Sequence, residues 1–209
     1  MLKGPAPGPI ISLELTRLRS ERPVSGGQRP ASSGQLPAAA SDIRTITTAA
    51  GVVDIYSRDP AFLIAASGRY AIQIIRDRGT MITVSLMRRA LEDLSIRYDK
   101  FGYVAVIEPD AQLLMPADIR NGFNAVVKRY STRFTGAAIV FEKTGFHATA
   151  VRSVVTAINL ASRATHPNQV FSDLREGVSW LSHLTPGEPT AGGLLAIIQQ
   201  LRQSLGARA

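Results

Sequence analysis

The chain has 209 residues, of which 45% are apolar and 19% charged, a composition typical of a soluble globular domain with additional segments. It has no cysteine, which excludes disulfide bonds and thiolate metal sites and fits a cytoplasmic protein. The formal net charge is +8, but the basic residues are spread along the chain and only 6% of the residues are aromatic, which argues against a nucleic-acid-binding surface.

The first 42 residues are rich in Pro, Gly and Ser. This composition predicts a disordered or loosely attached arm rather than a packed element. Its first part, "MLKGPAPGPIISLEL", has only a brief apolar patch and is a poor match to a secretory signal. No apolar run approaches the roughly 18 residues that a membrane-spanning helix needs, so we expect no transmembrane segment.

Ordered structure is expected to begin at Ile43. The runs "IRTITT", "VVDIYS" and "AFLIAAS" have the length of strands and are separated by the turn signals "AAG" and "RDP". They predict three antiparallel strands joined by short turns. Between Tyr70 and Tyr98 the apolar spacing changes, and from Ile82 onward it has the three-to-four period that predicts an amphipathic helix.

Strands and helices alternate after this helix. The predicted strands are "FGYVAVIE", "GAAIVFE" and "QVF". The predicted helices are "PADIRNGFNAVVKRYSTRF", which starts at Pro116, "FHATAVRSVVTAINLASRA", and "SDLREGVSWLSHL", with Ser172 as its N-cap. The order βββ-α-β-α-β-α-β-α predicts an α/β domain over residues 43–184, in which a mixed sheet has antiparallel entry strands followed by parallel βα units.

The last part of the chain predicts one further helix. Residues 185–193 have the composition of a linker, and "LLAIIQQLRQSL" over residues 194–205 has the pattern of an amphipathic helix of about three turns. Such a helix is too short to be stable alone in water. We expect it to dock on the domain, on another copy of the chain or on a partner, so a homo-oligomer through Leu194–Leu205 is one expected arrangement.

The alternation that ends in "PNQVFSDLREGVSWL" resembles the STAS-like fold of bacterial anti-sigma-factor antagonists and of a related group of lipid-binding domains. The stretch from Gly145 to Leu181 is most similar to a set of small, uncharacterised bacterial proteins of that fold. The resemblance implies a regulatory, signalling type of protein-interaction module. In the antagonists, a kinase phosphorylates a serine at the start of the helix after the central strand. The matching stretch here, Glu108–Ile119, contains no Ser, Thr or Tyr, so the switch serine is missing.

Three carboxylates lie in this matching stretch. Asp110 corresponds to the aspartate at the strand end of the antagonists, and Asp118 lies near their switch position. Asp118 either imitates a permanently phosphorylated state or complements the helix dipole. Glu108 and Asp110 flank Pro109, which favours a solvated turn over a site of paired carboxylates. We assign Asp110, Asp118 and Arg120 to a hypothetical partner surface.

A second candidate surface is the stretch "EKTGFHATAVR". Thr144 and Gly145 precede the expected N-terminus of a helix, whose free N–H groups attract anions, and Lys143, His147 and Arg152 add positive potential. The other interpretation is a turn that glycine permits before a buried helix. This stretch motivates an alternative function, the binding of a small anionic or lipidic ligand.

No sequence motif with a known catalytic mechanism is present: the Walker A, G-x-G-x-x-G, H-E-x-x-H and G-x-S-x-G patterns are all missing. His147, His166 and His183 are isolated from one another in sequence, which argues against a metal site. We therefore predict a non-enzymatic module without cofactor or metal, which binds a protein partner whose identity the sequence does not give.

Overall fold

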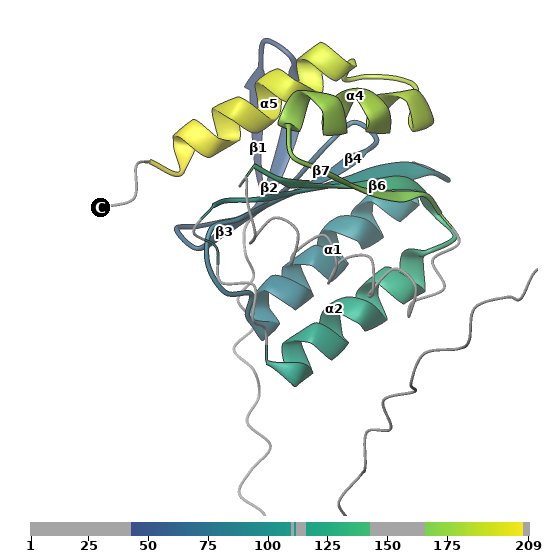
Figure 1. The fold of residues 1–209 in the computed structure, drawn as a ribbon. Coiled ribbons are helices and arrows are strands. Elements are labelled where there is room, and N and C mark those ends of the chain that lie inside the picture. The colour runs from purple at the N-terminus through teal and green to yellow at the C-terminus, as the bar shows by residue number, and fades with distance from the viewer. Residues whose placement is uncertain (1–42, 110, 112–115, 143–165, 207–209) are drawn as a thin grey trace, which may run out of the picture. The chain divides into compact units, whose positions relative to one another are not determined.

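The computed structural model describes residues 43–109, 111, 116–142 and 166–206, all of which belong to the unit Ala40–Ala209. Seven strands of this part form one sheet, and four helices pack on it (Figure 1). The strands are β1 (Arg44–Thr48), β2 (Gly51–Asp59), β3 (Phe62–Ser67), β4 (Tyr70–Ile75), β5 (Phe101–Ile107), β6 (Phe134–Phe141) and β7 (Asn168–Phe171). The helices are α1 (Met81–Arg97), α2 (Ala117–Tyr130), α4 (Leu174–Leu184) and α5 (Ala191–Ser204).

The sheet is mixed, and its strand order follows the chain from β1 to β7. Strands β1 to β4 pair antiparallel, whereas β4 to β7 pair parallel. The predicted α/β class, with antiparallel entry strands and parallel βα units, is therefore confirmed. The predicted helix "FHATAVRSVVTAINLASRA" and the predicted arm of residues 1–42 lie outside the described residues.

One element was predicted wrongly, because the entry meander has four strands rather than three. Residues Tyr70–Ile75 form β4, which pairs with β3 along its whole length. Its six residues are all buried, and a short, continuously apolar run does not distinguish a central strand from a buried helix. The preceding turn contains Gly68 at φ +50°, a left-handed conformation that glycine adopts without a steric cost.

Each face of the sheet carries its own hydrophobic core, because strand side chains alternate between the two faces. In β4, Ile72 and Ile74 belong to the cluster that includes α4 and α5, whereas Ala71 belongs to the cluster that includes α1 and α2. Figure 1 shows α4 and α5 on one side of the sheet and α1 and α2 on the other. The described part of the domain therefore has three layers.

The helix starts follow the expected capping chemistry, with one correction. The backbone N–H of Thr83 donates to Thr80 Oγ1, and the Thr80 N–H donates to Thr83 Oγ1, which together close a capping box at α1. Helix α2 begins directly after Pro116. The N-cap of α4 is Asp173 rather than Ser172, because the Asp173 carboxylate accepts from the Glu176 N–H at 2.9 Å.

The last helix, α5, docks on its own domain. It begins at Ala191 rather than at Leu194, and Thr190 caps it by accepting from the Gly193 N–H at 3.2 Å. Its apolar side is buried in the same cluster as the sheet, through Leu194, Ile197, Ile198 and Leu201. The face through which we predicted a homo-oligomer is thus covered within the chain.

Candidate functional site

The parallel strands β4, β5 and β6 end together at one edge of the sheet. Ile75 pairs with Ile107, and Ile107 pairs with Phe141, so these three residues are in register and form a small buried cluster. The residue after each is charged: Arg76 follows β4, Glu108 follows β5 and Glu142 follows β6. Open α/β proteins place ligands and chemistry at this carboxyl edge, which makes the charged row the candidate site.

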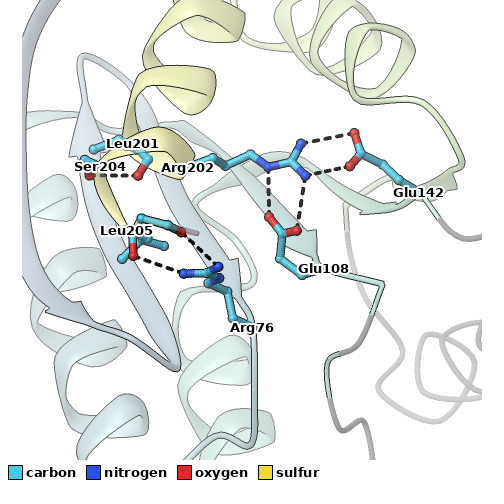
Figure 2. A network of polar contacts seen from close by, with 8 residues as sticks. Arg76, Glu108, Glu142, Leu201, Arg202, Ser204 and Leu205 are labelled. Atoms are coloured by element: carbon cyan, nitrogen blue, oxygen red, sulfur yellow. Dashed lines mark hydrogen bonds and ion pairs between the residues drawn. The ribbon is translucent and has the colours of Figure 1, made fainter. Parts of the chain in front are cut away.

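The two carboxylates of this row bind one arginine from α5. Arg202 donates from Nε to Glu108 Oε1 at 2.8 Å and from Nη2 to Glu108 Oε2 at 3.2 Å. It also donates from Nη1 to Glu142 Oε1 at 3.2 Å and from Nη2 to Glu142 Oε2 at 2.8 Å. Figure 2 shows the guanidinium lying between the two carboxylates, each of which it contacts in a bidentate fork. We call Arg202, Glu108 and Glu142 the α5 clasp.

The α5 clasp is largely shielded from water. The side chains of Arg202, Glu108 and Glu142 are 25%, 20% and 27% exposed. Burial by itself acts to lower the pKa of Arg202, but its hydrogen bonds and charge interactions with Glu142 and Glu108 outweigh that effect and raise the pKa. The guanidinium therefore stays charged, and each carboxylate has a cationic partner.

Two further arginines hold the C-terminal end of α5. Arg76 donates to the carbonyl oxygens of Leu205 at 3.2 Å and Gly206 at 3.1 Å, as Figure 2 shows in part. Arg58 of β2 donates to the carbonyl oxygen of Ser204. The last carbonyls of a helix have no partner within the helix and carry partial negative charge, so the two guanidinium groups both satisfy and stabilise this end.

The structure sorts the residues singled out from the sequence into three groups. Asp118 and Arg120 are both exposed on α2, with Asp118 in its first turn, and neither belongs to the α5 clasp. Asp110, Thr144, Gly145, His147 and Arg152 lie outside the described residues, so the anionic or lipidic ligand site stays a prediction. The turn expected at Glu108 is present, since the Ala111 N–H donates to the Glu108 carbonyl oxygen at 3.0 Å. The Glu108 side chain is only 20% exposed, however, and its carboxylate binds Arg202.

Two residues of the clasp, Glu142 and Arg202, were not singled out from the sequence. A signal for Glu142 was present: "YVAVIE" and "AAIVFE" each end an apolar strand with glutamate, so parallel pairing brings the two carboxylates to one edge. Arg202 lies on the polar side of a short helix, and no spacing rule indicates which distant residue such a side chain reaches.

No protein-family model, curated protein or solved structure matches this chain. Within the residues that the structure describes, no helix is both long enough and apolar enough to cross a membrane. In the same residues, no three side chains of the His, Asp or Glu type come together as a group that could hold a metal ion.

Proposed function

We propose that the chain is a non-enzymatic protein-interaction or regulatory module of the STAS-like fold that lacks the phosphorylatable switch serine. The observation that carries the proposal is the α5 clasp at the carboxyl edge. The edge that would hold a substrate is instead occupied by the chain's own arginine, which engages both of the acidic side chains that follow β5 and β6.

Engagement of both carboxylates argues against their use as acid and base. A general base needs a lone pair within reach of the substrate proton and a pKa near the working pH. Each carboxylate here accepts two hydrogen bonds from a guanidinium, which occupy the oxygens that would face a substrate.

The partner surface in this proposal is the exposed side of α2. Ile119, Val126 and Tyr130 are the buried residues of α2, while Asp118 and Arg120 are exposed on its first turn. The helix therefore presents a fixed negative charge at its N-terminus, where the phosphorylated serine of the resembling family adds charge. A partner that recognises that charge would bind this chain without phosphorylation.

The experiment is affinity capture from a lysate of the source organism with the wild-type chain and the variants Asp118→Ser and Asp118→Lys. The matched control is Glu176→Lys, since Glu176 is also exposed and also lies in the first turn of a helix, α4. Both lysine variants are expected to lose a similar small stability, about 0.3–1 kcal/mol.

We expect Asp118→Lys to lose a specific protein that the wild type and Glu176→Lys both retain. Identical captured proteins for all four chains would contradict a partner surface on α2. Direct binding of the purified partner, measured by titration calorimetry, then separates a weaker affinity from a loss of folded chain.

A further inference from the structure

The first strand of the sheet has an open edge. Strand β1 pairs with β2 over all five of its residues, and among the residues that the structure describes no strand lies on its outer side. In an antiparallel pair, every second residue turns its backbone N–H and C=O groups away from the partner strand. The outer edge of β1 therefore presents a regular row of hydrogen-bonding groups, whose geometry fits another extended strand.

The two edges of the sheet differ in how they are protected. Natural edge strands are commonly blocked by shortness, by proline or lysine, or by a bulge. At the far edge, β7 has four residues and directly follows Pro167. Strand β1 is "RTITT", without proline or lysine, and its register with β2 is continuous, because the bulge in β2 lies after Ile55, the partner of Arg44. The β1 edge is thus unprotected and rich in β-branched residues, which favour strand pairing.

The sequence of β1 is complementary to itself in an antiparallel arrangement. A two-fold axis at Ile46 places Ile46 opposite its copy, Thr45 opposite the Thr47 of the other copy, and Arg44 opposite its Thr48. No like charges then face each other, and the two Arg44 residues lie about 14 Å apart along the strands, beyond the screening length at physiological salt. Thr–Thr and β-branched pairs of this kind stabilise antiparallel strands.

The charge beside this edge is neutralised within the chain. Asp54 of β2 accepts from Thr45 Oγ1 at 2.8 Å and pairs with Arg97 at 2.9 Å, so no free carboxylate meets an approaching strand. The side chains of Thr45 and Thr47 are exposed, whereas Ile46 packs against the core cluster that includes α4 and α5. Pairing centred on Ile46 keeps that contact and adds the Ile46 of the other copy beside it.

We propose that two copies of the chain join through their β1 edges, antiparallel and centred on Ile46, so that their seven-stranded sheets form one continuous sheet. We call this contact the β1 interface. Because its two-fold axis is perpendicular to the sheet, both copies present α2 on the same face. The proposal goes beyond the interaction module, since it concerns the assembly of the chain and uses neither Asp118 nor the α5 clasp.

The first test is the mass of the full chain by sedimentation equilibrium, for the wild type and the variants Thr47→Lys and Gln169→Lys. Lysine at position 47 brings two like charges to diagonal positions about 7–8 Å apart across the β1 interface, so we expect the dissociation constant of the dimer to rise about 10-fold or more. Gln169 is also exposed, on the opposite edge strand β7, and its variant should keep the dimer. A wild-type chain that is monomeric at every concentration, or equal dissociation of both variants, would overturn the proposal.

The second test examines the register. The chain has no cysteine, so a single introduced thiol can form a disulfide only between two copies. Facing residues of antiparallel strands have Cα atoms about 4.5–5.5 Å apart, within the range that a disulfide spans. The variant Ile46→Cys should therefore form the disulfide-linked dimer several-fold faster than Gln169→Cys, although Gln169 is the more exposed residue. Equal rates would contradict pairing centred on Ile46.

The outcomes separate this proposal from the proposed function. A monomeric wild type with a capture difference at Asp118 leaves the interaction module in place and removes the β1 interface. A dimer with no capture difference at Asp118 keeps the β1 interface and rejects α2 as the partner surface.

Discussion

Two helices on opposite faces of the sheet each end in an arginine that pairs with a strand carboxylate, and the two pairings differ. Arg97, in the last turn of α1, contacts Asp54 of β2 at 2.9 Å, and we call these two residues the α1 clasp. Arg202, in the last turn of α5, contacts both Glu108 and Glu142. The side chain of Arg97 is 41% exposed, whereas that of Arg202 is 25% exposed.

The surroundings explain why the same residue type has different consequences. The α1 clasp borders a shallow groove of about 350 Å³, and the neighbouring Ile96 is 78% exposed, so water competes with the ion pair. The α5 clasp joins one helix to two strand ends. Ion pairs in contact with water contribute little, while a shielded pair is costly to break because it leaves a charge without a partner. The number of carboxylate partners and the exposure of the arginine therefore decide how much Arg97 and Arg202 each stabilise the fold.

The largest expected effect comes from the apolar anchors rather than the arginines. Leu194 of α5 and Leu91 of α1 are both essentially inaccessible to water. Substitution of either by alanine removes buried methyl groups and leaves a cavity, so we expect each to lower the free energy of unfolding by about 2–5 kcal/mol. Urea denaturation measures both. A loss below about 1 kcal/mol for Leu194→Ala would mean that α5 is not anchored on the sheet.

The next largest expected effect is a difference in stability loss between the α5 clasp and the α1 clasp. Arg202→Ala leaves two partly shielded carboxylates without their partner, and we expect a loss of about 2 kcal/mol in the free energy of unfolding. Arg97→Ala should cost less than about 1 kcal/mol, since Arg97 is more exposed than Arg202 and pairs with one carboxylate rather than two. Urea denaturation of both variants at the same ionic strength gives the comparison. Equal losses would show that exposure does not distinguish the clasps.

The smallest expected effect is a pH dependence of the free energy of unfolding. It should affect the α1 side and the α5 side of the sheet equally. His166 is buried, and burial lowers its pKa, an effect that its hydrogen bonds to Ser131 and Asn168 oppose but do not cancel. The folded chain then favours neutral His166, while the unfolded chain takes up a proton below the ordinary pKa of 6.5. Stability is therefore retained above pH 6.5 and lost as the pH falls below it.

Thermal melts between pH 7.5 and 5 check this direction. The variant His166→Gln should lose less stability over that range than the wild type, and His183→Gln, which changes an exposed histidine, serves as the matched control. An unchanged pH profile for His166→Gln would show that another group titrates with folding. Arg202→Ala and Arg97→Ala are best compared above pH 7, where His166 contributes equally to both.

The sequence predicted those parts of the fold that have local signals. The helix from Ile82 onward, the strands "FGYVAVIE" and "GAAIVFE", and the start of the helix after Pro116 follow from period and capping chemistry. The helix after Pro116 was predicted to reach Phe134, but it ends at Tyr130, and Phe134 begins β6. Tyr70–Ile75 was missed, since a six-residue buried run has no period of its own.

The candidate site was less predictable, because its contacts join residues that are far apart in sequence. Arg202 and Glu108 are separated by 94 positions, and Arg202 and Glu142 by 60. The glutamates could have been placed at one edge from the strand pattern. The arginine between them depends on how α5 docks on the sheet, which its apolar face allows but does not specify.

Amide hydrogen exchange along α5 tests most directly whether the α5 clasp closes the carboxyl edge. In the wild type, residues 201–205 should be protected. Arg202→Ala should raise their exchange about 10-fold or more, the factor that about 1.4 kcal/mol of lost local stability produces. Residues 191–198 should keep their protection, and Arg97→Ala should leave all of α5 unchanged. Fast exchange of residues 201–205 in the wild type, at the rate of Arg202→Ala, would contradict the account.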